Sequence, residues 1–423
     1  MKNKEFISYA NSFQAVPNLG LGRIASLLEK AQNPQNSLKY IHIAGTNGKG
    51  SVCSFLQAIF TRSGLRTGKF TSPNMLRVNE RITVDGVEIS DSDLERLLLA
   101  MKKLSEQVAL ETGEAPSQFE IWTAVAMVYF KEQNCDMVIL ETGLGGRFDA
   151  TNVIGTPLMS IITRIDLDHT DLLGGTITEI AFEKAGIIKP NGVTLTLCQD
   201  KEALDTIAGV AEKQNNSLMT ADMPVLHTPE GIYECFSYRQ FDHLICGLGG
   251  LHQVENAVLA IECASHLNIP EQYIISGIRN AKNPGRFELI SEEPAVIFDG
   301  AHNPNGIAAL LKSLERYYQD QKKAFILAFM GDKDIGQILR LLKKVNAETF
   351  YFTKVKDNER ALSADRLYDI AKENGIDGVV CNDVKSALEK CAHADTRVHK
   401  KNNGKITVIC GSLYLYKDLF SSD

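Results

Sequence analysis

The sequence lacks the patterns that would mark a membrane protein, a nucleic-acid-binding protein or a secreted disulfide-linked domain. Its nine cysteines include no Cys-x-x-Cys pair, so we expect reduced, mostly buried thiols rather than zinc ligands or disulfides. The longest apolar run, residues 121–130, is half as long as the roughly 20 residues that a membrane-spanning helix needs. No basic run accompanies the net charge of −7, which argues against a surface for nucleic acids or lipid headgroups.

Targeting segments, repeats and low-complexity segments are not evident either. The first residues, MKNKEFISYANSF, carry positive charge but precede no apolar core, so we expect no signal peptide and a soluble, cytoplasmic protein. At 423 residues, the chain exceeds the size at which one hydrophobic core usually keeps growing, and two domains are expected. The content of 44% apolar and 23% charged residues is that of an ordinary globular protein.

Apolar strand-like segments alternate with amphipathic segments along almost the whole chain, which predicts an α/β fold with mainly parallel sheets. A buried strand at 40–44 precedes a glycine-rich turn and a segment whose apolar residues recur at helical spacing. Further buried strands are expected at 135–140 and 158–163. Residues 193–250 are less regular, with one helix near 201–214.

Three local patterns predict where elements turn or begin. Asp85-Gly86 within 80–89 suits the type I′ turn of a β-hairpin. Ser92 with Glu95 forms a capping-box pattern at the start of a long helix, and Thr176 with Glu179 forms another.

The pattern changes around 283–294, where we place the boundary between domains of residues 1–290 and 295–423. Beyond it, helical segments separate five expected strands, at 295–299, 324–330, 349–353, 377–381 and 405–410. This order predicts a second, smaller α/β domain of ordinary size.

The strongest local signal is GTNGKGS at 45–51, between the strand at 40–44 and the following helix. Glycines let backbone N–H groups turn towards phosphate oxygens, and the helix N-terminus adds its positive dipole end. Lys49 supplies a mobile charge for phosphates, and Ser51 can reach Mg²⁺. The segment departs from GxxxxGK[ST], because Gly50 separates Lys49 from Ser51. A bare turn is the alternative, but strand, lysine, hydroxyl and helix in this order predict a phosphate-binding loop.

Three other side chains stand where a metal–nucleotide site would need ligands. Glu141 ends a buried strand, where open α/β sheets bind ligands and where Mg²⁺-ATP needs oxygen atoms, although a surface loop would also place a glutamate there. His169 also follows a buried strand, but a lone histidine is usually structural and Mg²⁺ prefers oxygen. Lys184 lies on a predicted helix, where the ordinary expectation is an exposed lysine.

Polar residues follow several strands of the predicted carboxyl-terminal domain. The segment DGAHNP at 299–304 follows a strand, and Pro304 suits the first turn of a helix. Asp, His and Asn at a strand end can bind ribose, orient a base or hold an acyl phosphate, although glycine and proline alone would explain a turn. DKD at 332–334 and Gly411-Ser412 follow other strands. Several polar strand ends together favour a functional edge.

These motifs, in this order, resemble those of the folylpolyglutamate synthase/dihydrofolate synthase family, within the Mur-ligase superfamily of ATP-dependent amide ligases. The matching segments are GTNGKGS (45–51), TSP (71–73), NERI (79–82), ETGLGGRFDATN (141–152), LDHTDLLG (167–174), EKAGIIK (183–189), DGAHNP (299–304), DKD (332–334) and GSLYL (411–415). The resemblance covers residues 17–416. It implies a P-loop-containing amino-terminal ATPase domain with a mainly parallel sheet, and a smaller Rossmann-like carboxyl-terminal ligase domain.

The resemblance also implies site residues by position. ATP contacts are implied at Gly45, Asn47, Gly48, Lys49, Gly50, Ser51, Asn256, Arg286 and Asp299. Metal ligands are implied at Ser51, Ser72, Glu141, His169 and Lys184, the last as a carbamate formed with CO₂. Pterin or folate contacts are implied at Ser117, Gln118, Phe119, Glu120, Phe148, Asp149 and Ala150. Catalytic roles are implied for Lys49, Lys184, Asp299, His302 and Ser412.

The activity implied is the ATP-dependent addition of L-glutamate to dihydropteroate or to the γ-carboxyl of reduced folate glutamates, with release of ADP and phosphate. A carboxylate repels an amine and has no good leaving group, so an acyl phosphate intermediate is expected. ATP, two Mg²⁺ ions, K⁺ and the carbamate are the implied cofactors, and a monomer is implied. GGRFDATN favours an enzyme that acts on both acceptor types.

Three rival functions remain open at this level. A ligase that joins an amino acid to a UDP-linked muramoyl peptide belongs to the same superfamily. A P-loop kinase or NTPase would account for Lys49 and Glu141 but not for DGAHNP or the second domain. A nucleotide-gated binding protein would need only the phosphate loop.

Overall fold

The computed structural model describes residues 20–345, 347–396 and 405–421. The expected absence of a signal peptide concerns residues outside this range, as does the start of the resemblance at 17–19. The described chain forms two compact units. The first runs through Val225 and also contains Tyr238–Leu244 and Glu255–Ala281, and the second contains Leu226–Ser237, Ile245–Val254 and the chain from Lys282.

The first unit is built on a sheet with the strand order β4-β3-β2-β5-β1-β6-β7-β8. Its strands are β1 (Tyr40–Ala44), β2 (Thr67–Phe70), β3 (Ile82–Val84), β4 (Val87–Glu88), β5 (Met137–Glu141), β6 (Met159–Ile162), β7 (Val193–Leu197) and β8 (Ser217–Ala221). All neighbours from β2 to β8 pair in parallel. The chain passes from β1 to β2 on one side and later from β5 to β6 on the other, so the order reverses around β1. Ligands bind at such switch points, outside the carboxyl ends of the strands.

Helices cover both faces of this sheet. They are α2 (Gly22–Lys30), α3 (Lys49–Arg62), α4 (Asp91–Thr112), α5 (Gln118–Glu132), α6 (Thr170–Leu173), α7 (Ile177–Ala185), α8 (Lys201–Lys213), α9 (Gln253–His266) and α10 (Glu271–Asn280), with 3₁₀ turns η1 (Pro34–Ser37), η2 (Val78–Arg81) and η3 (Ala150–Val153). Phe70 lies 5.7 Å (ring centroids) from Phe119 of α5, whereas the preceding Lys69 interacts electrostatically with Cys53 of α3. Because successive strand residues face opposite sides, α3 and α5 cover opposite faces.

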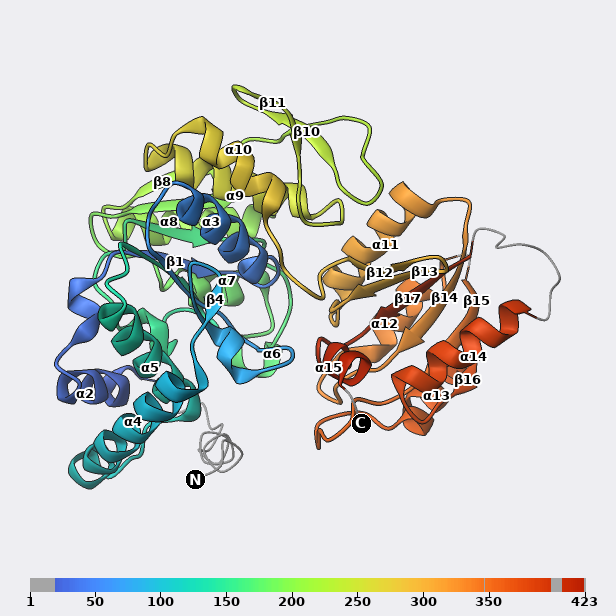
Figure 1. The fold of residues 1–423 in the computed structure, drawn as a ribbon, viewed down its shortest axis with the longest axis horizontal. Helices are drawn as coiled ribbons and strands as arrows, with labels where there is room; N and C mark the ends of the chain where they lie inside the picture. The colour runs from blue at the N-terminus through green and yellow to red at the C-terminus, as the bar shows by residue number, and fades with distance from the viewer. Residues whose placement is uncertain (1–19, 346, 397–404, 422–423) are drawn as a thin grey trace. The chain divides into compact units, whose positions relative to one another are not determined.

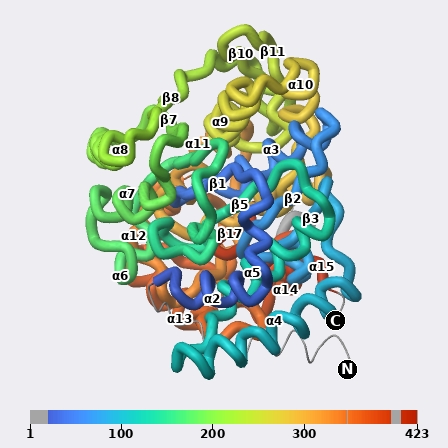
Figure 2. The backbone as a smooth tube through the Cα atoms, turned by 90° about the vertical axis from the view of Figure 1, so that its left-hand side faces the viewer, coloured from blue at the N-terminus to red at the C-terminus, as the bar shows by residue number. Residues whose placement is uncertain are grey.

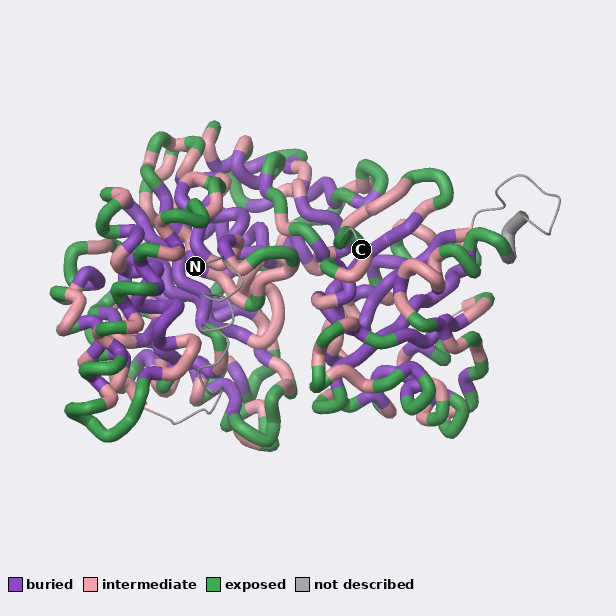
Figure 3. The backbone as a smooth tube through the Cα atoms, turned by 60° about the horizontal axis from the view of Figure 1, so that its bottom comes forward, coloured by how far each residue is buried: buried purple, intermediate pink, exposed green. Residues whose placement is uncertain are grey.

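The packing partners of these helices are visible in two views. Helix α10 packs along α3 on one face (Figure 1), and α2, α4 and α5 pack against one another (Figure 2). Figure 3 shows that buried residues run through the centre of each unit while exposed residues lie on helices and loops. No helix within the described ranges is long and apolar enough to cross a membrane.

Two of the three local predictions are confirmed and one is wrong. Asp85 and Gly86 both have positive φ (52° and 82°) between β3 and β4, as a type I′ turn requires. Thr176 and Glu179 form the expected capping box of α7. Helix α4, however, is capped by Ser90, whose extended backbone lets its hydroxyl accept from Asp93 N. The expected cap residue Ser92 therefore lies inside the first helical turn.

The second unit contains a six-stranded sheet with the order β12-β13-β17-β14-β15-β16. Its strands are β12 (Glu288–Glu292), β13 (Ala295–Asp299), β14 (Lys322–Leu327), β15 (Ala347–Phe352), β16 (Val379–Val380) and β17 (Lys405–Cys410). The helices are α11 (Pro304–Tyr318), α12 (Ile335–Leu342), α13 (Ala364–Glu373), α14 (Val384–Thr396) and α15 (Tyr414–Phe420). All five expected strands are present. The edge strand β12, antiparallel to β13, was not predicted.

The less regular segment contains a small sheet of β9 (Val225–Leu226), β10 (Cys235–Tyr238) and β11 (Phe241–Ile245), and the helix near 201–214 is present as α8. A partly buried ion pair attaches part of this segment to the second unit. Arg316 of α11 donates to both carboxylate oxygens of Glu234 at 2.5 and 2.9 Å, and the Tyr317 hydroxyl donates to the same carboxylate at 2.7 Å. Glu234 is fully buried.

Candidate active site

The loop between β1 and α3 requires glycine at two positions. Gly45 has a φ of 151°, and a Cβ there would lie 1.8 Å from Thr163 Oγ1. Gly48 has a φ of 96° and caps the N-terminus of α3. A Cβ on Gly48 would lie 2.2 Å from Asn256 Oδ1. The structure therefore brings Asn256 of α9 against the expected phosphate loop.

Hydrogen bonds to the residues after β6 hold the first half of this loop. Arg164 O accepts from Thr46 N at 2.9 Å and from Asn47 N at 3.4 Å, and Thr163 Oγ1 donates to Asn47 O at 2.7 Å. The first hydrogen bond of α3 runs from Val52 N to Gly48 O. The N–H groups of residues 48–51 precede that bond and form the helix N-terminus, where anions bind.

Two lysines meet at the carbonyl of Gly45. Lys49 Nζ donates to Gly45 O at 2.9 Å, and Lys184 Nζ of α7 donates to the same oxygen at 2.9 Å. Lys184 is 5% exposed. Burial, helped by the charge of Lys49, lowers the pKa of Lys184 from 10.5 to about 7. The ordinary expectation of an exposed lysine is therefore wrong, and its amine is far less basic than that of an ordinary lysine.

The carboxyl end of β5 places a buried carboxylate near this loop. Glu141 pairs in register with Ile43 of β1 and is 5% exposed. Its Oε2 accepts from Ser72 N at 3.3 Å, so two expected metal ligands are in contact. Another of the five expected metal ligands, Ser51, is buried in the first turn of α3.

Two charged residues near Glu141 were not assigned roles from the sequence. Glu80, within NERI, accepts hydrogen bonds from the backbone N–H groups of residues 75, 76 and 77 at 2.7–2.8 Å, which fixes the loop that carries Ser72. Lys69 lies on the same face of the sheet as Glu141, since it pairs with Ile139, two residues earlier on β5. Burial lowers the pKa of Lys69, and Cys53, Glu141 and Glu80 oppose that shift.

His169, another expected metal ligand, lies in the loop after β6. It caps the short helix α6 with a φ of 51°, it is exposed, and its backbone N donates to Asp168 Oδ1 at 3.0 Å. In the described part of the chain, no three His, Cys, Asp or Glu side chains gather as a metal-binding group. A metal here would depend on serine hydroxyls and on Glu141 as well.

The residues expected to contact a pterin divide into two groups. Ser117 and Glu120 form the capping box of α5, and Glu120 also accepts from Arg23 Nε at 3.2 Å. Their side chains therefore hold the start of α5 in place. Phe119 lies against Gly143, 2.6 Å from where a Cβ would stand. Phe148 is 38% exposed, although the Arg147 guanidinium lies over its ring, 4.4 Å from the ring centroid.

Asp149 and Ala150 belong with Ser117 and Glu120 in the first of these groups. The buried Asp149 carboxylate accepts from Gly143 N and Leu144 N at 2.8 and 2.9 Å, and from Thr151 N and Oγ1 at 3.0 and 2.5 Å. Burial raises the pKa of Asp149, and these four donors oppose that shift. Ala150 is buried at the start of η3. Gln118 is the first residue of α5.

In the second unit, β13 and β17 end at the same edge because Asp299 pairs in parallel register with Cys410. Asp299 accepts from Phe287 N at 2.9 Å and from Ala301 N at 2.7 Å. His302 Nδ1 lies 2.8 Å from Gly300 O. A carbonyl only accepts, so Nδ1 carries a proton in this hydrogen bond.

The other two expected residues of this unit lie near the same strand ends. Arg286 Nη1 is 3.4 Å from the position of a Cβ on Gly300. Ser412 is buried two residues after the end of β17, and its hydroxyl accepts from Tyr414 N at 3.3 Å. The structure thus brings Arg286, Asp299, His302 and Ser412 to one edge of this sheet.

Comparison with known proteins decides the family. The Mur ligase middle domain matches residues 43–264, and the Mur ligase glutamate ligase domain matches residues 285–413. Dihydrofolate synthase/folylpolyglutamate synthase of Bacillus subtilis is 36% identical over 415 residues, covering 95% of this chain and 94% of that protein. The chain belongs to the dihydrofolate synthase/folylpolyglutamate synthase family of Mur ligases.

Solved structures agree with this membership. Mycobacterium tuberculosis folylpolyglutamate synthase complexed with ADP and AMPPCP superposes with a TM-score of 0.90, at 28% identity and full coverage of both chains. The Escherichia coli FolC protein in complex with DHPP and ADP has a TM-score of 0.87, at 28% identity over 99% of this chain and 97% of that one. The Mur-ligase fold, with a large mainly parallel sheet and a second α/β unit, is therefore shown.

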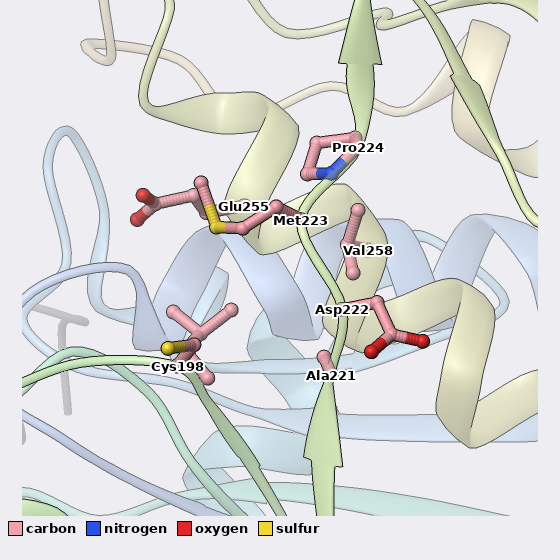
Figure 4. Close-up of a pocket in the computed structure, with 8 residues that line it drawn as sticks. Cys198, Ala221, Asp222, Met223, Pro224, Glu255 and Val258 are labelled. Atoms are coloured by element: carbon pink, nitrogen blue, oxygen red, sulfur yellow. The ribbon is translucent and has the colours of Figure 1, made fainter.

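A small pocket of this Mur ligase lies at the carboxyl ends of β7 and β8, beside α9 (Figure 4). It is lined by Leu197, Cys198, Ala221, Asp222, Met223, Pro224, Glu255 and Val258. Its volume of about 10 Å³ suits one water molecule. It contains none of the residues expected to bind nucleotide, metal or folate, and we assign no catalytic role to it.

Proposed function

We propose that this chain uses ATP to add L-glutamate to dihydropteroate and to the γ-carboxyl of reduced folate glutamates, through an acyl phosphate. The observation that carries the proposal is the helix N-terminus at Gly48–Lys49, with Asn256 against it and two lysines at Gly45 O. Family membership selects glutamate ligation among the reactions that such a phosphate loop serves. The relatives' names support both acceptor types.

The nucleotide contacts follow from the donors at this loop. The N–H groups of Gly48, Lys49, Gly50 and Ser51 would receive phosphate oxygens, and Lys49 Nζ would exchange Gly45 O for the β- and γ-phosphates. We also propose that Asn256 contacts the nucleotide from α9, next to Gly48. Gly45 and Asn47 shape the loop. In the second unit, Arg286 and Asp299 are the proposed ATP contacts.

The donor set fits magnesium if Lys184 is carbamylated. Ser51, Ser72 and Glu141 offer hard oxygen atoms, and His169 is the proposed nitrogen ligand. Because its pKa is lowered, the Lys184 amine has a neutral form available near neutral pH, and this form can attack CO₂, forming an N–C bond and releasing one proton, which gives a carboxylate-like group. Two Mg²⁺ ions, with K⁺ as a further cation, would supply positive charge that stabilises the phosphate oxygens. ¹³C-bicarbonate should give a carbamate signal by NMR, and the signal should be absent in Lys184→Met.

The chemistry assigns a task to each remaining group. The acceptor carboxylate attacks the γ-phosphorus of ATP, ADP leaves, and the glutamate amine then displaces phosphate from the acyl carbon. His302 Nε2 can take a proton from the glutamate ammonium, since Nδ1–H is held by Gly300 O. Ser412 would orient the same region. Phe119 and Phe148 would contact the pterin, framed by Ser117, Gln118, Glu120, Asp149 and Ala150.

The deciding assay measures ADP release with dihydropteroate, tetrahydrofolate or a UDP-muramoyl peptide, each with and without L-glutamate. We expect ADP release only with a pterin acid and glutamate together. Release with the muramoyl substrate, or release that needs no acceptor, would overturn the proposal in favour of a cell-wall ligase or an NTPase. Size-exclusion chromatography and cell fractionation test the accompanying proposals of a monomer and a cytoplasmic location.

A further inference from the structure

One histidine of the central strand is completely buried and has an unusual environment. His42 of β1 is 0% exposed, and its Nε2 lies 2.8 Å from Thr151 Oγ1. Its Nδ1 has no hydrogen-bond partner among the residues that the structure describes. Burial, helped by the charge of Lys189, lowers the pKa of His42 to about 3, so the ring is neutral.

The directions of the hydrogen bonds around Thr151 are fixed by chemistry. An ionised carboxylate only accepts, so Thr151 Oγ1 donates its proton to Asp149 Oδ1 at 2.5 Å. The same hydroxyl oxygen must then accept from His42 Nε2–H. His42 therefore carries its proton on Nε2, and the three side chains form one directed chain, His42 to Thr151 to Asp149.

This chain ends at the loop that follows β5. The other oxygen of Asp149 accepts from Gly143 N and Leu144 N at 2.8 and 2.9 Å. Gly143 lies two residues after Glu141 and packs against Phe119. His42 itself lies three residues before Gly45, the start of the phosphate loop. The chain thus connects the strand that leads into the phosphate loop with the loop proposed to receive the pterin.

We propose that His42 is a positioning residue for the acceptor substrate, which it holds in place through Thr151, Asp149 and the 143–144 turn. The proposal rests on the proposed function, because it concerns the KM of the pterin acid. The phosphate loop has its own contacts, to Arg164 O and Thr163 Oγ1. Loss of the hydrogen-bond chain should therefore raise the KM of the acceptor substrate and leave nucleotide binding intact.

Two matched pairs of variants test this role. His42→Gln can place an amide donor near the Nε2 position, whereas His42→Asn places its donor near Nδ1, where no described partner lies. Thr151→Ser keeps the hydroxyl, and Thr151→Val removes it at nearly constant shape. We expect His42→Asn and Thr151→Val to raise the KM of the pterin acid roughly tenfold, and their partners to stay within about threefold. The KM of ATP should stay within about twofold in all four.

A double variant separates positioning from general destabilisation. If both residues act through one chain, His42→Asn with Thr151→Val should raise the acceptor KM no more than either change alone. Additive effects, an unchanged acceptor KM in His42→Asn, or equal rises in the KM of ATP and acceptor would each overturn the proposal.

A measurement without turnover distinguishes this failure from failure of the proposed function. If the wild-type protein releases no ADP with any pterin acid and glutamate, the proposed function fails. The hydrogen-bond chain from His42 to Asp149 is then tested separately, by NMR of ¹⁵N-histidine-labelled protein. We expect one Nε2–H proton that exchanges slowly with water and becomes exchangeable in Thr151→Val but not in Thr151→Ser. The absence of that proton, or its survival in Thr151→Val, would refute the hydrogen-bond chain.

Discussion

Replacing Lys184 with methionine should change the pH dependence of stability in a direction set by the buried amine. Its pKa is lowered from 10.5 to about 7, mainly by burial. Below pH 7 both the folded and the unfolded chain hold the proton, and the folded chain bears the full cost of a buried charge. Between pH 7 and 10.5 the unfolded chain binds more protons than the folded one, so the stability of the wild-type protein rises with pH.

The size of the effect follows from the two pKa values. Their difference, 10.5 minus 7, at about 1.36 kcal/mol per pH unit, corresponds to roughly 5 kcal/mol of destabilisation at low pH. Raising the pH from 7 to 9 should relieve about 2 kcal/mol of it. For a unit of this size that is a shift of roughly 4–8 °C in the unfolding temperature. Methionine has no proton to lose, so the variant should lack this gain.

Calorimetry in CO₂-free buffer at pH 7 and pH 9 provides the measurement. The unfolding temperature of Lys184→Met minus that of the wild type should be several degrees higher at pH 7 than at pH 9. Lys213→Met, which changes an exposed lysine of α8, is the control and should show the same difference at both pH values. An equal difference for Lys184→Met at the two pH values would refute the assignment of a buried, weakly basic amine.

Three further variants test the proposed site by activity. Lys49→Ala should abolish ADP formation with the near-UV circular dichroism unchanged, and near-normal ADP release would contradict its role at the phosphates. Lys184→Ala should lose activity that acetate partly restores, whereas full activity without acetate would leave the lysine a structural residue. Gly48→Ala should raise the KM of ATP roughly tenfold, because its Cβ would lie 2.2 Å from Asn256 Oδ1 at a φ of 96°. Adding Asn256→Ala to Gly48→Ala would remove the steric clash but leave the backbone strain at residue 48. An unchanged KM of ATP in Gly48→Ala would refute the contact between residue 48 and Asn256.

Most strands could be predicted because buried parallel strands are continuous apolar runs. Apolar runs located five strands of the second sheet, including the short and partly exposed β16, but not β12, whose residues are only partly buried and which lies antiparallel at the edge. The boundary placed at 283–294 was a linear division of the chain. Leu226–Ser237 and Ile245–Val254 belong to the second unit through contacts such as Arg316 with Glu234, which no local pattern contains.

For the candidate site, the sequence predicted the positions of several residues but not the state of their side chains. Strand ends located Glu141, Asp299 and Ser412, because the carboxyl ends of parallel strands share an edge. The state of each side chain could not be predicted. Helical spacing placed Lys184 without showing that it is buried, and a lone histidine in a strand gave no indication of a bond to Thr151. Burial and long-range contacts determine pKa and proton direction, and both arise only in the folded chain.

The motif GTNGKGS at 45–51 predicted the phosphate loop but not the distant residues that hold it in place. Its first N–H groups are held by Arg164 O, and its capping glycine is packed by Asn256. Arg164 also contacts the neighbour of Asn256: its guanidinium donates to both carboxylate oxygens of Glu255 at 2.8 Å. A partly exposed ion pair of this kind contributes about 1 kcal/mol or less, so its effect on the fold is small. It joins the chain just after β6 to the first turn of α9, next to the loop proposed to bind the nucleotide.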